Sequence, residues 1–586
     1  YNIVGNVFAE INFLRNFSFR TSIGLSNYNT MYQTFSGAQA ENAEANSKVN
    51  SLSVNASMSR TLTFSNTLNY QKDFGKHKLD FLIGTETVQA SSRSLSASSD
   101  DYFTVNKNYL LLQNGAERYP GSSGRGKTAL LSYFGRFDYN YNDRYLFGTT
   151  IRRDGSSYFG PNKRFGTFPS FSVGWRVSQE DFMRGISWVN DLKIRVSYGV
   201  LGSQNNVAVL NQFSTYGSSI YYAAYDMSGT SNSVDVGMYK NRIGNSATGW
   251  EEDVVRNLGI DIVLLNNSLD FQIDLYKKSI NGLLLTEPLP SVIGALVSSP
   301  TVNIGDIQNT GIDLSAKYRF NIGNFRNSIN MNFTHYKNEI IDLPDPGYFG
   351  GSSRNEEGYP TGMFYGYKIT GIFNSQEEID DAPTQDAAQP GRFRYEDYNK
   401  DGIITSDDRQ FLASPHPDFI YGIILNTEYK GFDLSAQFYG VQGNTIYNQT
   451  RMSTDFFQSN ITANKSRKLL NAWTPENTNT TVPKIENVQS FSTTTSFNSY
   501  ALEDGSYFRL KTVTLGYSFN TKSPFMQRLM LSNLRIYTQA SNLFTITKYS
   551  GLDPDIASGS PESFGIDVAT YPTNEPKVTF GVTLTY

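Results

Sequence analysis

A twelve-residue stretch from Asp397 to Asp408 contains the residues best suited to bind a metal ion. Oxygen-bearing side chains occupy its positions 1, 3, 5, 9 and 12, glycine occupies position 6, and position 7 offers its carbonyl. An EF-hand-type loop wraps Ca²⁺ in oxygen ligands with this spacing. The sequence therefore predicts a structural Ca²⁺ site over 397–408. Its predicted ligands are Asp397, Asn399, Asp401, Ile403 (through its carbonyl), Thr405 and Asp408.

Two features of this stretch leave an alternative open. Its flanks lack a helical pattern, and Asp408 stands where the usual ligand is the longer Glu. A solvated acidic turn is the other interpretation. The binding of Ca²⁺ by a loop outside helices would stiffen the loop and would not drive catalysis.

Tyrosines in two long segments are the predicted contacts for a ligand. Aromatic faces stack on sugar rings and grip peptides, and they are enriched at contact surfaces. Packing between loops, or contact with a partner subunit, is an equal alternative, and no residue pattern decides between glycan and peptide. The candidates are Tyr216, Tyr221, Tyr222, Tyr225, Tyr359, Tyr365 and Tyr367.

Catalysis finds little support in the sequence. The chain has no Cys, and its three His residues lie in a short turn, a strand and a loop without the helical spacing of metal ligands. We therefore expect no catalytic residue and a protein that is not an enzyme. A net charge of −4 also argues against a nucleic-acid partner.

Strict alternation of apolar and polar residues dominates the chain and indicates an all-β fold. In the last stretch, Lys577–Tyr586, Val, Phe, Val, Leu and Tyr share one face and Lys, Thr and Gly share the other. We count about seventeen such strands, most of them about 7 to 15 residues long. No run of about 18 apolar residues is present, although 14% of the chain is aromatic. This pattern favours a large antiparallel transmembrane β-barrel over a soluble all-β adhesin.

Short and long connections alternate between the predicted strands. Outer-membrane barrels have short periplasmic turns and long extracellular loops, so this alternation predicts a barrel over 1–586. The segment 338–418, with the acidic stretch 397–408, is predicted as one long extracellular loop. The short turns are Leu14–Asn16, Gln71–His77, Asn142–Asp143, Asn266–Asn267, Asn321–Asn324 and Lys430–Gly431, and the long segments include Asn29–Asn50 and Ser91–Lys127.

The odd number of strands has a structural consequence. An unclosed sheet edge in lipid leaves backbone groups unsatisfied, so seventeen strands cannot close a barrel alone. We expect about five further strands upstream, which gives about 22 in the complete protein, the size class with a plugged lumen.

Several stretches resemble the SusC/RagA family of TonB-dependent outer-membrane transporters of Bacteroidota. Together they extend over nearly the whole chain. They are Tyr133–Tyr141, Ile151–Ser157, Phe168–Arg176, Leu192–Gly199, Glu503–Leu510, Ser541–Phe544 and Gly551–Asp555.

The resemblance implies a 22-stranded barrel in the cell outer membrane with an N-terminal plug. It also implies a SusD-like lipoprotein as a lid, and import of glycans or oligopeptides driven by TonB. The sequence departs from the family because no plug and no TonB box precede Tyr1. Active transport is therefore implied only if those parts lie upstream or on another chain. The alternative is a structural subunit of a larger outer-membrane assembly without active transport.

Overall fold

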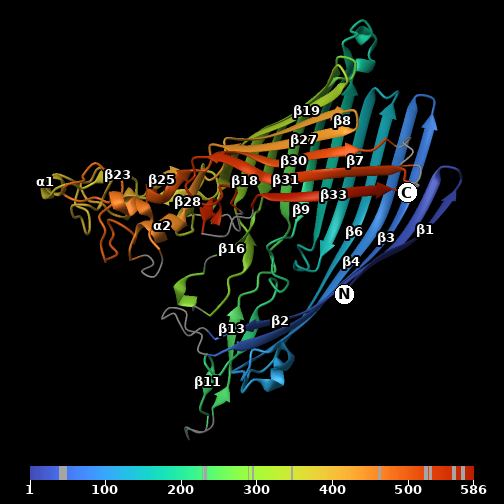
Figure 1. Ribbon diagram of the computed structural model, residues 1–586. Coiled ribbons are helices and arrows are strands. Elements are labelled where there is room, and N and C mark those ends of the chain that lie inside the picture. Colours follow the sequence, from blue (N-terminus) through green and yellow to red (C-terminus); the bar gives the residue numbers. More distant parts are fainter. Residues whose placement is uncertain are drawn as a thin grey trace. The chain divides into compact units, whose positions relative to one another are not determined.

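In the computed structural model of the chain, β-strands are the main secondary structure (Figure 1). Among the described residues, no helix combines the length and hydropathy needed to cross a bilayer. The chain forms two compact units: the first comprises Tyr1–Trp175, Ser197–Val254 and Ile280–Ile304, and the second comprises Arg176–Val196, Val255–Ser279 and Gly305–Tyr586. The described residues are 1–38, 49–227, 229, 234–287, 289–293, 296–344, 347–458, 464–520, 526, 531–556, 563–568 and 574–585.

The first unit contains a run of long antiparallel strands in which each pairs with the next long strand along the chain. These are β1 (Asn2–Phe13), β2 (Phe17–Ser36), β3 (Ser51–Phe74), β4 (His77–Asp100), β6 (Ser122–Tyr141), β7 (Tyr145–Ser156) and β8 (Phe165–Arg176). The two-residue β5 (Glu117–Arg118) pairs with the end of β4. The 3₁₀ turns η1 (Lys107–Tyr109) and η2 (Leu112–Asn114) stand between β4 and β5.

Short hairpins fill the connections of the first unit. They are β10 (Thr215–Ser218) with β13 (Met238–Arg242), β11 (Ala224–Tyr225) with β12 (Asp235–Val236), and β16 (Leu284–Thr286) with β17 (Thr301–Asn303). The turn η5 (Ser291–Ile293) precedes β17. Three further long strands have residues in both units: β9 (Val189–Ser203), β14 (Glu251–Leu264) and β15 (Leu269–Asn281). The turns η3 (Val177–Gln179) and η4 (Asp181–Met183), which belong to the second unit, precede β9.

The second unit contains a similar run, again with each strand antiparallel to the next. Its strands are β18 (Asp306–Ile322), β19 (Phe325–Asp342), β26 (Phe419–Tyr429), β27 (Phe432–Gln442), β30 (Tyr507–Ser518), β31 (Asn533–Thr547) and β33 (Lys577–Thr585). The predicted final strand is therefore confirmed, except for Tyr586, which lies outside the described residues.

The two faces of these strands differ as the alternation predicts. Leu434 of β27 lies opposite Leu515 of β30 with both side chains exposed, an arrangement suited to lipid. On the other face, Asp433 forms an ion pair with Arg535 of β31. Charged pairs thus lie on the face that would line a water-filled lumen, where charge is tolerated.

Short turns connect neighbouring long strands at the six predicted places. Asn142 and Asp143 have φ of 55° and 53°, and Lys430 and Gly431 have φ of 46° and 91°. Asn, Asp and Gly adopt this left-handed backbone most readily, which explains their use in the tightest turns.

Strand number is predicted well and strand length is not. Seventeen described strands have nine or more residues, as expected, but β3 and β4 each have 24. The expected loops Asn29–Asn50 and Ser91–Lys127 are wrong in part, since β4 and β6 continue to pair with Ser91 opposite Lys127. In these extensions the strands are held together by backbone hydrogen bonds, although apolar and polar residues do not alternate along them. A 24-residue strand spans about 80 Å, far more than a bilayer requires.

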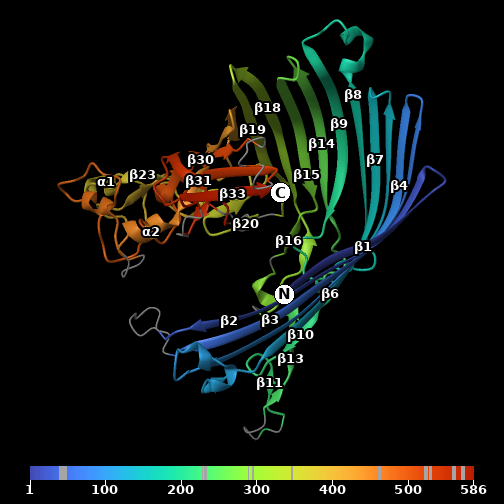
Figure 2. The ribbon, with the colours of Figure 1, turned by 45° about the vertical axis from the view of Figure 1, so that its right-hand side comes forward.

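The described residues within 343–418 and 443–506 of the second unit form a folded group that we call the loop domain. Figure 2 shows α1, β23 and α2 of this group lying together. Its elements are β20 (Tyr348–Phe349), β21 (Ser353–Asn355), β22 (Met363–Gly366), β23 (Ile369–Ile372), α1 (Gln376–Asp380), β24 (Phe393–Tyr395), η6 (Ser406–Asp408), β25 (Gln410–Ala413), β28 (Thr445–Asn448), α2 (Gln449–Asp455), η7 (Arg467–Asn471), η8 (Ser499–Ala501) and β29 (Leu502–Asp504). The strand β32 (Ile566–Asp567) pairs with β28.

A hydrophobic core holds the loop domain together. It joins residues from both sequence segments: Tyr367, Ile372, Phe393, Tyr395, Ile404, Phe456, Trp473, Tyr500 and Ala501. Burial of these large side chains is the main driving force for ordering such long connections. The described residues of these two long connections are therefore packed around a core of their own.

Candidate functional site

The acidic loop 397–408 is organised by its own side chains. Asp397 Oδ2 accepts the Gly402 N–H at 2.9 Å, and Asp401 Oδ1 accepts the Ile403 N–H at 2.9 Å. Gly402 has φ of +85°, a conformation that glycine adopts without strain. The oxygen-bearing side chains thus shape a tight turn, as the spacing predicts.

Asp408 closes the loop from inside. Its side chain is completely buried, Oδ1 accepts the Tyr398 N–H at 2.8 Å, and Oδ2 accepts the Thr405 N–H at 2.7 Å. Both carboxylate oxygens therefore satisfy backbone donors. In the described part of the chain, no group of three or more Asp, Glu or His side chains is placed to hold a metal ion. The Ca²⁺ site stays a prediction, and Asp408 is its least suitable ligand.

The loop is fixed to the hydrophobic core along one side. Ile404 is buried in that core, and its N–H donates to the carbonyl of Thr384 at 2.8 Å. The Thr384 N–H in turn donates to the carbonyl of Gly402 at 2.8 Å. These contacts attach the acidic loop to the core.

The four tyrosine candidates of the first unit are exposed. Tyr221 is 90% exposed, and Tyr216, Tyr222 and Tyr225 are each more than half exposed. Tyr222 lies edge-on to Tyr239 with ring centroids 5.5 Å apart. These rings are free to meet a partner, and their role as ligand contacts stays a prediction.

The three candidates of the loop domain have different surroundings. Tyr359 stacks on Phe411 with ring centroids 3.8 Å apart, and Tyr365 meets the same ring edge-on at 5.2 Å. Tyr367 is only 6% exposed and stacks on Tyr395 at 5.1 Å. Burial raises the pKa of Tyr367. Its ring packs within the core in this structure, so Tyr367 is a packing residue rather than an open contact surface.

Each His contacts a different partner. His77 Nδ1 lies 2.8 Å from the hydroxyl of Tyr139, and His335 Nδ1 lies 2.6 Å from the carbonyl of Asp418. His416 Nε2 lies 2.9 Å from the carbonyl of Thr361, and burial lowers the pKa of this imidazole. These contacts are structural in kind.

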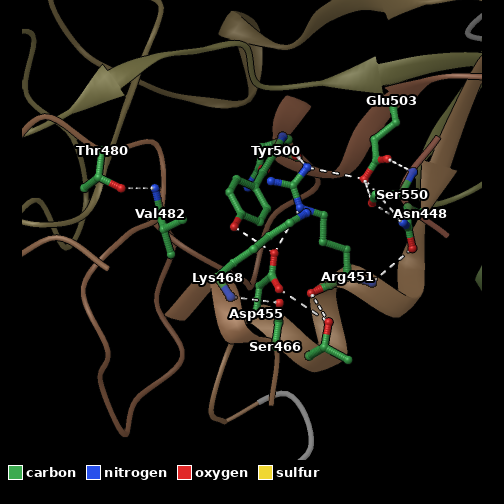
Figure 3. Close-up of polar contacts among 12 residues, drawn as sticks. Asn448, Arg451, Asp455, Ser466, Lys468, Thr480, Val482, Tyr500, Glu503 and Ser550 are labelled. Carbon is green, nitrogen blue, oxygen red and sulfur yellow. Dashed lines mark hydrogen bonds and ion pairs between the residues drawn. The ribbon is translucent and has the colours of Figure 1, made fainter. Parts of the chain in front are cut away.

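A buried polar network that sequence reasoning missed centres on Arg451 of α2 (Figure 3). The guanidinium donates to Asp455 Oδ2 at 3.0 Å and to the carbonyl of Tyr500 at 3.0 Å. The Tyr500 hydroxyl also donates to Asp455 Oδ2 at 3.0 Å, and burial raises the pKa of this phenol, which therefore keeps its proton. The Asp455 side chain is 1% exposed, so it depends on these donors.

Glu503 extends the network to a second element (Figure 3). Its carboxylate lies 3.4 Å from Arg451 Nη1 and accepts the Ser550 hydroxyl and N–H at 2.8 Å each. Asn448 Nδ2 donates to Glu503 Oε1 at 3.3 Å. The network thus connects α2, β29 and the chain after β31.

Two of the stretches that carry the family resemblance meet at Arg509. Its side chain is 2% exposed, and it forms ion pairs with Asp553 and with Asp555 Oδ2, the latter at 3.2 Å. Nε donates to the Thr545 hydroxyl at 2.8 Å. Composition alone could not predict this pairing. The only indication in the sequence was that both motifs belong to the stretches that carry the family resemblance.

Comparisons with known proteins agree with this architecture. No protein-family model matches the chain. TonB-dependent receptor P3 of Formosa agariphila is 31% identical, and the match covers 99% of this chain and 58% of the relative. TonB-dependent receptor SusC of Bacteroides thetaiotaomicron is 27% identical, and the match covers 87% of this chain and 49% of the length of the relative.

Solved structures give the same result. The structure of the RagAB peptide transporter matches with a TM-score of 0.84 at 25% identity, covering 100% of this chain and 62% of the matched chain. The chain spans about three fifths of the length of the proteins it matches most fully.

These findings identify the class of protein. The chain has the fold of the barrel of TonB-dependent receptors and is an outer-membrane protein whose strands span the lipid. Within that class, its resemblance to the SusC/RagA family is confirmed along nearly the whole chain.

Proposed function

We propose that the protein imports glycans or oligopeptides across the outer membrane, driven by TonB, as the barrel of a complex with a SusD-like lipoprotein. The observation that carries this proposal is the match of all of this chain to the RagAB peptide transporter at a TM-score of 0.84. The relatives are named as receptors, which supports a protein that is not an enzyme. TonB and the lipoprotein would engage the complete protein.

Deletion of the gene tests this proposal in the native host. Cells are given fluorescently labelled pools of neutral oligosaccharides and of tryptic peptides, with and without a proton-motive-force uncoupler. We expect energy-dependent uptake of one pool to disappear in the deletion strain and to return with the intact gene. Unchanged uptake of both pools, together with an altered mass of outer-membrane complexes, would instead identify a structural subunit.

We also propose that the acidic loop binds Ca²⁺ as a structural ion. The chemistry of Asp397, Asn399 and Asp401 supports this, because carboxylate and amide oxygens suit a hard cation. Such an ion would neutralise the clustered carboxylates and hold the turn. The orientation of Asp408 toward backbone donors supports a weak site rather than a tight one.

Substitution of the first and fifth loop positions should abolish Ca²⁺ retention. The variant Asp397→Ala/Asp401→Ala removes two predicted ligands, and retention of radioactive Ca²⁺ by the purified full chain is the measurement. The matched control is Asp380→Ala/Asp381→Ala, an exposed acidic pair at the end of α1 in the same loop domain. Equal retention by both variants would leave 397–408 as an acidic turn.

A further inference from the structure

Four basic side chains gather on one face of the neighbouring strands β3, β4 and β6 of the first unit (Figure 1). They are Arg60 of β3, Arg93 of β4, and Arg125 and Lys127 of β6, and all four are exposed. In the register of the sheet, Arg93 lies directly opposite Arg125. Ser91 of β4 pairs with Arg60 on one side and with Lys127 on the other. We call the four basic residues the basic cluster.

The face that carries the basic cluster is also the face suited to lipid. Side chains two residues apart in a strand share a face, so Arg60 shares its face with Leu62 and Phe64, which are both exposed. On β6, Lys127 shares its face with Tyr133, which is exposed as well. Exposed apolar side chains in such rows are typical of the outer surface of a membrane barrel. The basic cluster therefore adjoins the lipid-facing band.

The cluster lies at the height where that band ends. Tyr70, Phe81 and Phe137 form an aromatic row across β3, β4 and β6, close to the short turn between β3 and β4. Arg60 and Lys127 stand about ten residues farther along their strands. At about 3.3 Å per residue and a tilt of about 40°, that distance corresponds to about 25 Å of height, the usual thickness of the apolar band. Because short turns are periplasmic, the cluster lies at the border of the outer leaflet.

No carboxylate balances these charges. The face that carries the cluster has no Asp or Glu along the full length of β3, β4 and β6. In the described part of the chain, none of the four basic side chains forms an ion pair. On the opposite face of the same strands, Arg136 is paired with Asp80 and Asp138. The protein thus pairs its charges on the lumenal face and leaves those of the basic cluster open.

The opposition of Arg93 and Arg125 carries a cost that an anion would remove. Residues directly opposite in an antiparallel pair have Cβ atoms about 4.5–5.5 Å apart, and like charges in that arrangement are destabilising. Two guanidinium groups so close together can both donate to one phosphate, because planar N–H pairs match its oxygens. A phosphate monoester also carries between one and two negative charges at neutral pH. Arg60 and Lys127 flank the pair and add to the positive potential.

We propose that the basic cluster binds the phosphorylated headgroup of an outer-leaflet lipid, with Arg93 and Arg125 on the phosphate and the acyl chains along Leu62 and Phe64. The cations lie at the height of headgroups and the apolar side chains at the height of acyl chains, so a lipid matches both. A soluble anion would use the cations alone. The site lies on the face opposite the lumen, so it is separate from any import path and goes beyond the function proposed above.

Native mass spectrometry of the complete protein, purified from outer membranes in a non-ionic detergent, tests the proposal. The probes are dioleoyl phosphatidic acid, which has a phosphate monoester, dioleoyl phosphatidylcholine, which has the same chains without net charge, and inorganic phosphate, which has no chains. We expect phosphatidic acid to stay bound at micromolar concentrations at which the other two do not. Equal retention of phosphatidylcholine would show that the cations contribute nothing, and equal retention of inorganic phosphate would identify a site for a free anion. Either result would overturn the proposal.

The double variant Arg93→Gln/Arg125→Gln locates the site. Each cation near an anionic lipid surface contributes about a fivefold factor in affinity, so phosphatidic acid should bind about thirtyfold more weakly. Without lipid, the variant should be at least as stable to heat as the unchanged protein, because a repulsion between like charges has been removed. Phosphatidic acid binding as tight as that of the unchanged protein would contradict the proposal.

The matched control is Lys107→Gln/Lys240→Gln. It removes the same number of positive charges from exposed positions of the first unit that lie outside β3, β4 and β6. This variant should bind phosphatidic acid as the unchanged protein does. An equal loss of binding in both double variants would mean that only net charge matters, and the basic cluster would then be no site.

Discussion

Replacement of Arg451 by methionine should destabilise the loop domain by about 3–5 kcal/mol, the usual cost of breaking a buried ion pair by removing one partner. Methionine keeps most of the side-chain volume, so the loss comes from charge and hydrogen bonding. Asp455, at 1% exposure, would keep only the Tyr500 and Thr454 hydroxyls as side-chain donors among its described contacts. Glu503 would lose its cation as well.

Hydrogen exchange measures this effect in the intact chain. Amides of α2 and β29 should exchange about 150 to 5,000 times faster in Arg451→Met, because opening of the loop domain becomes more frequent. Amides in β3 and β4 should be unaffected, since the barrel strands are held by their own ladders.

The matched control is Arg184→Met. Arg184 also forms a close ion pair, with Asp181 at 2.8 Å, but the two side chains are 79% and 75% exposed. Exposed pairs contribute about 0–1 kcal/mol, so this variant should exchange like the unchanged protein. Similar exchange in both variants would show that the buried network contributes nothing beyond a surface pair.

Separation along the chain explains why the barrel could be predicted from the sequence and this network could not. The strand faces and the short turns are local properties: alternation along β18 and β33, and Asn142–Asp143 or Lys430–Gly431 in left-handed turns. Each needs only a few neighbouring residues to be recognised. The resemblance to a known family then supplied the class of protein.

The network depends on distances along the chain that no local pattern encodes. Arg451 reaches Tyr500 and Glu503, which lie 49 and 52 residues away. The ends of the long strands were mispredicted for a related reason. Ser91–Ser96 and Ser122–Lys127 pair through backbone groups, which every residue has, so no side-chain pattern marks the extension.

The acidic loop stands between these cases. Its spacing predicted a turn with Gly402 in a left-handed conformation, and the structure has that turn. The spacing could not predict that both oxygens of Asp408 face the backbone N–H groups of Tyr398 and Thr405. A sequence motif determines which oxygen atoms could bind a cation. Packing decides which of those oxygens are already occupied by hydrogen bonds from the protein.

Replacement of Arg509 by methionine should release the chain after β31 from the start of β30. The side chain of Arg509 is 2% exposed, and its guanidinium contacts Asp553, Asp555 and Thr545. Two carboxylates would be left without their cation, for an expected loss of about 3–5 kcal/mol of local stability. Faster hydrogen exchange and earlier proteolytic cleavage near 551–555 are the measurements. The control Arg319→Met breaks an ion pair with Asp270 in which the side chains are 44% and 36% exposed, and it should have little effect.

A triple variant separates the two physical causes of that loss. Arg509→Met/Asp553→Asn/Asp555→Asn removes the charges together, so no unpaired carboxylate remains in the site. If uncompensated charge causes the loss, the triple variant should recover most of the stability that Arg509→Met loses. If the hydrogen-bond geometry of the guanidinium is what matters, the triple variant should be no more stable than the single one. The first outcome is expected mainly because of Asp553, whose side chain is 11% exposed: an unpaired, desolvated carboxylate costs more than a neutral amide of the same shape.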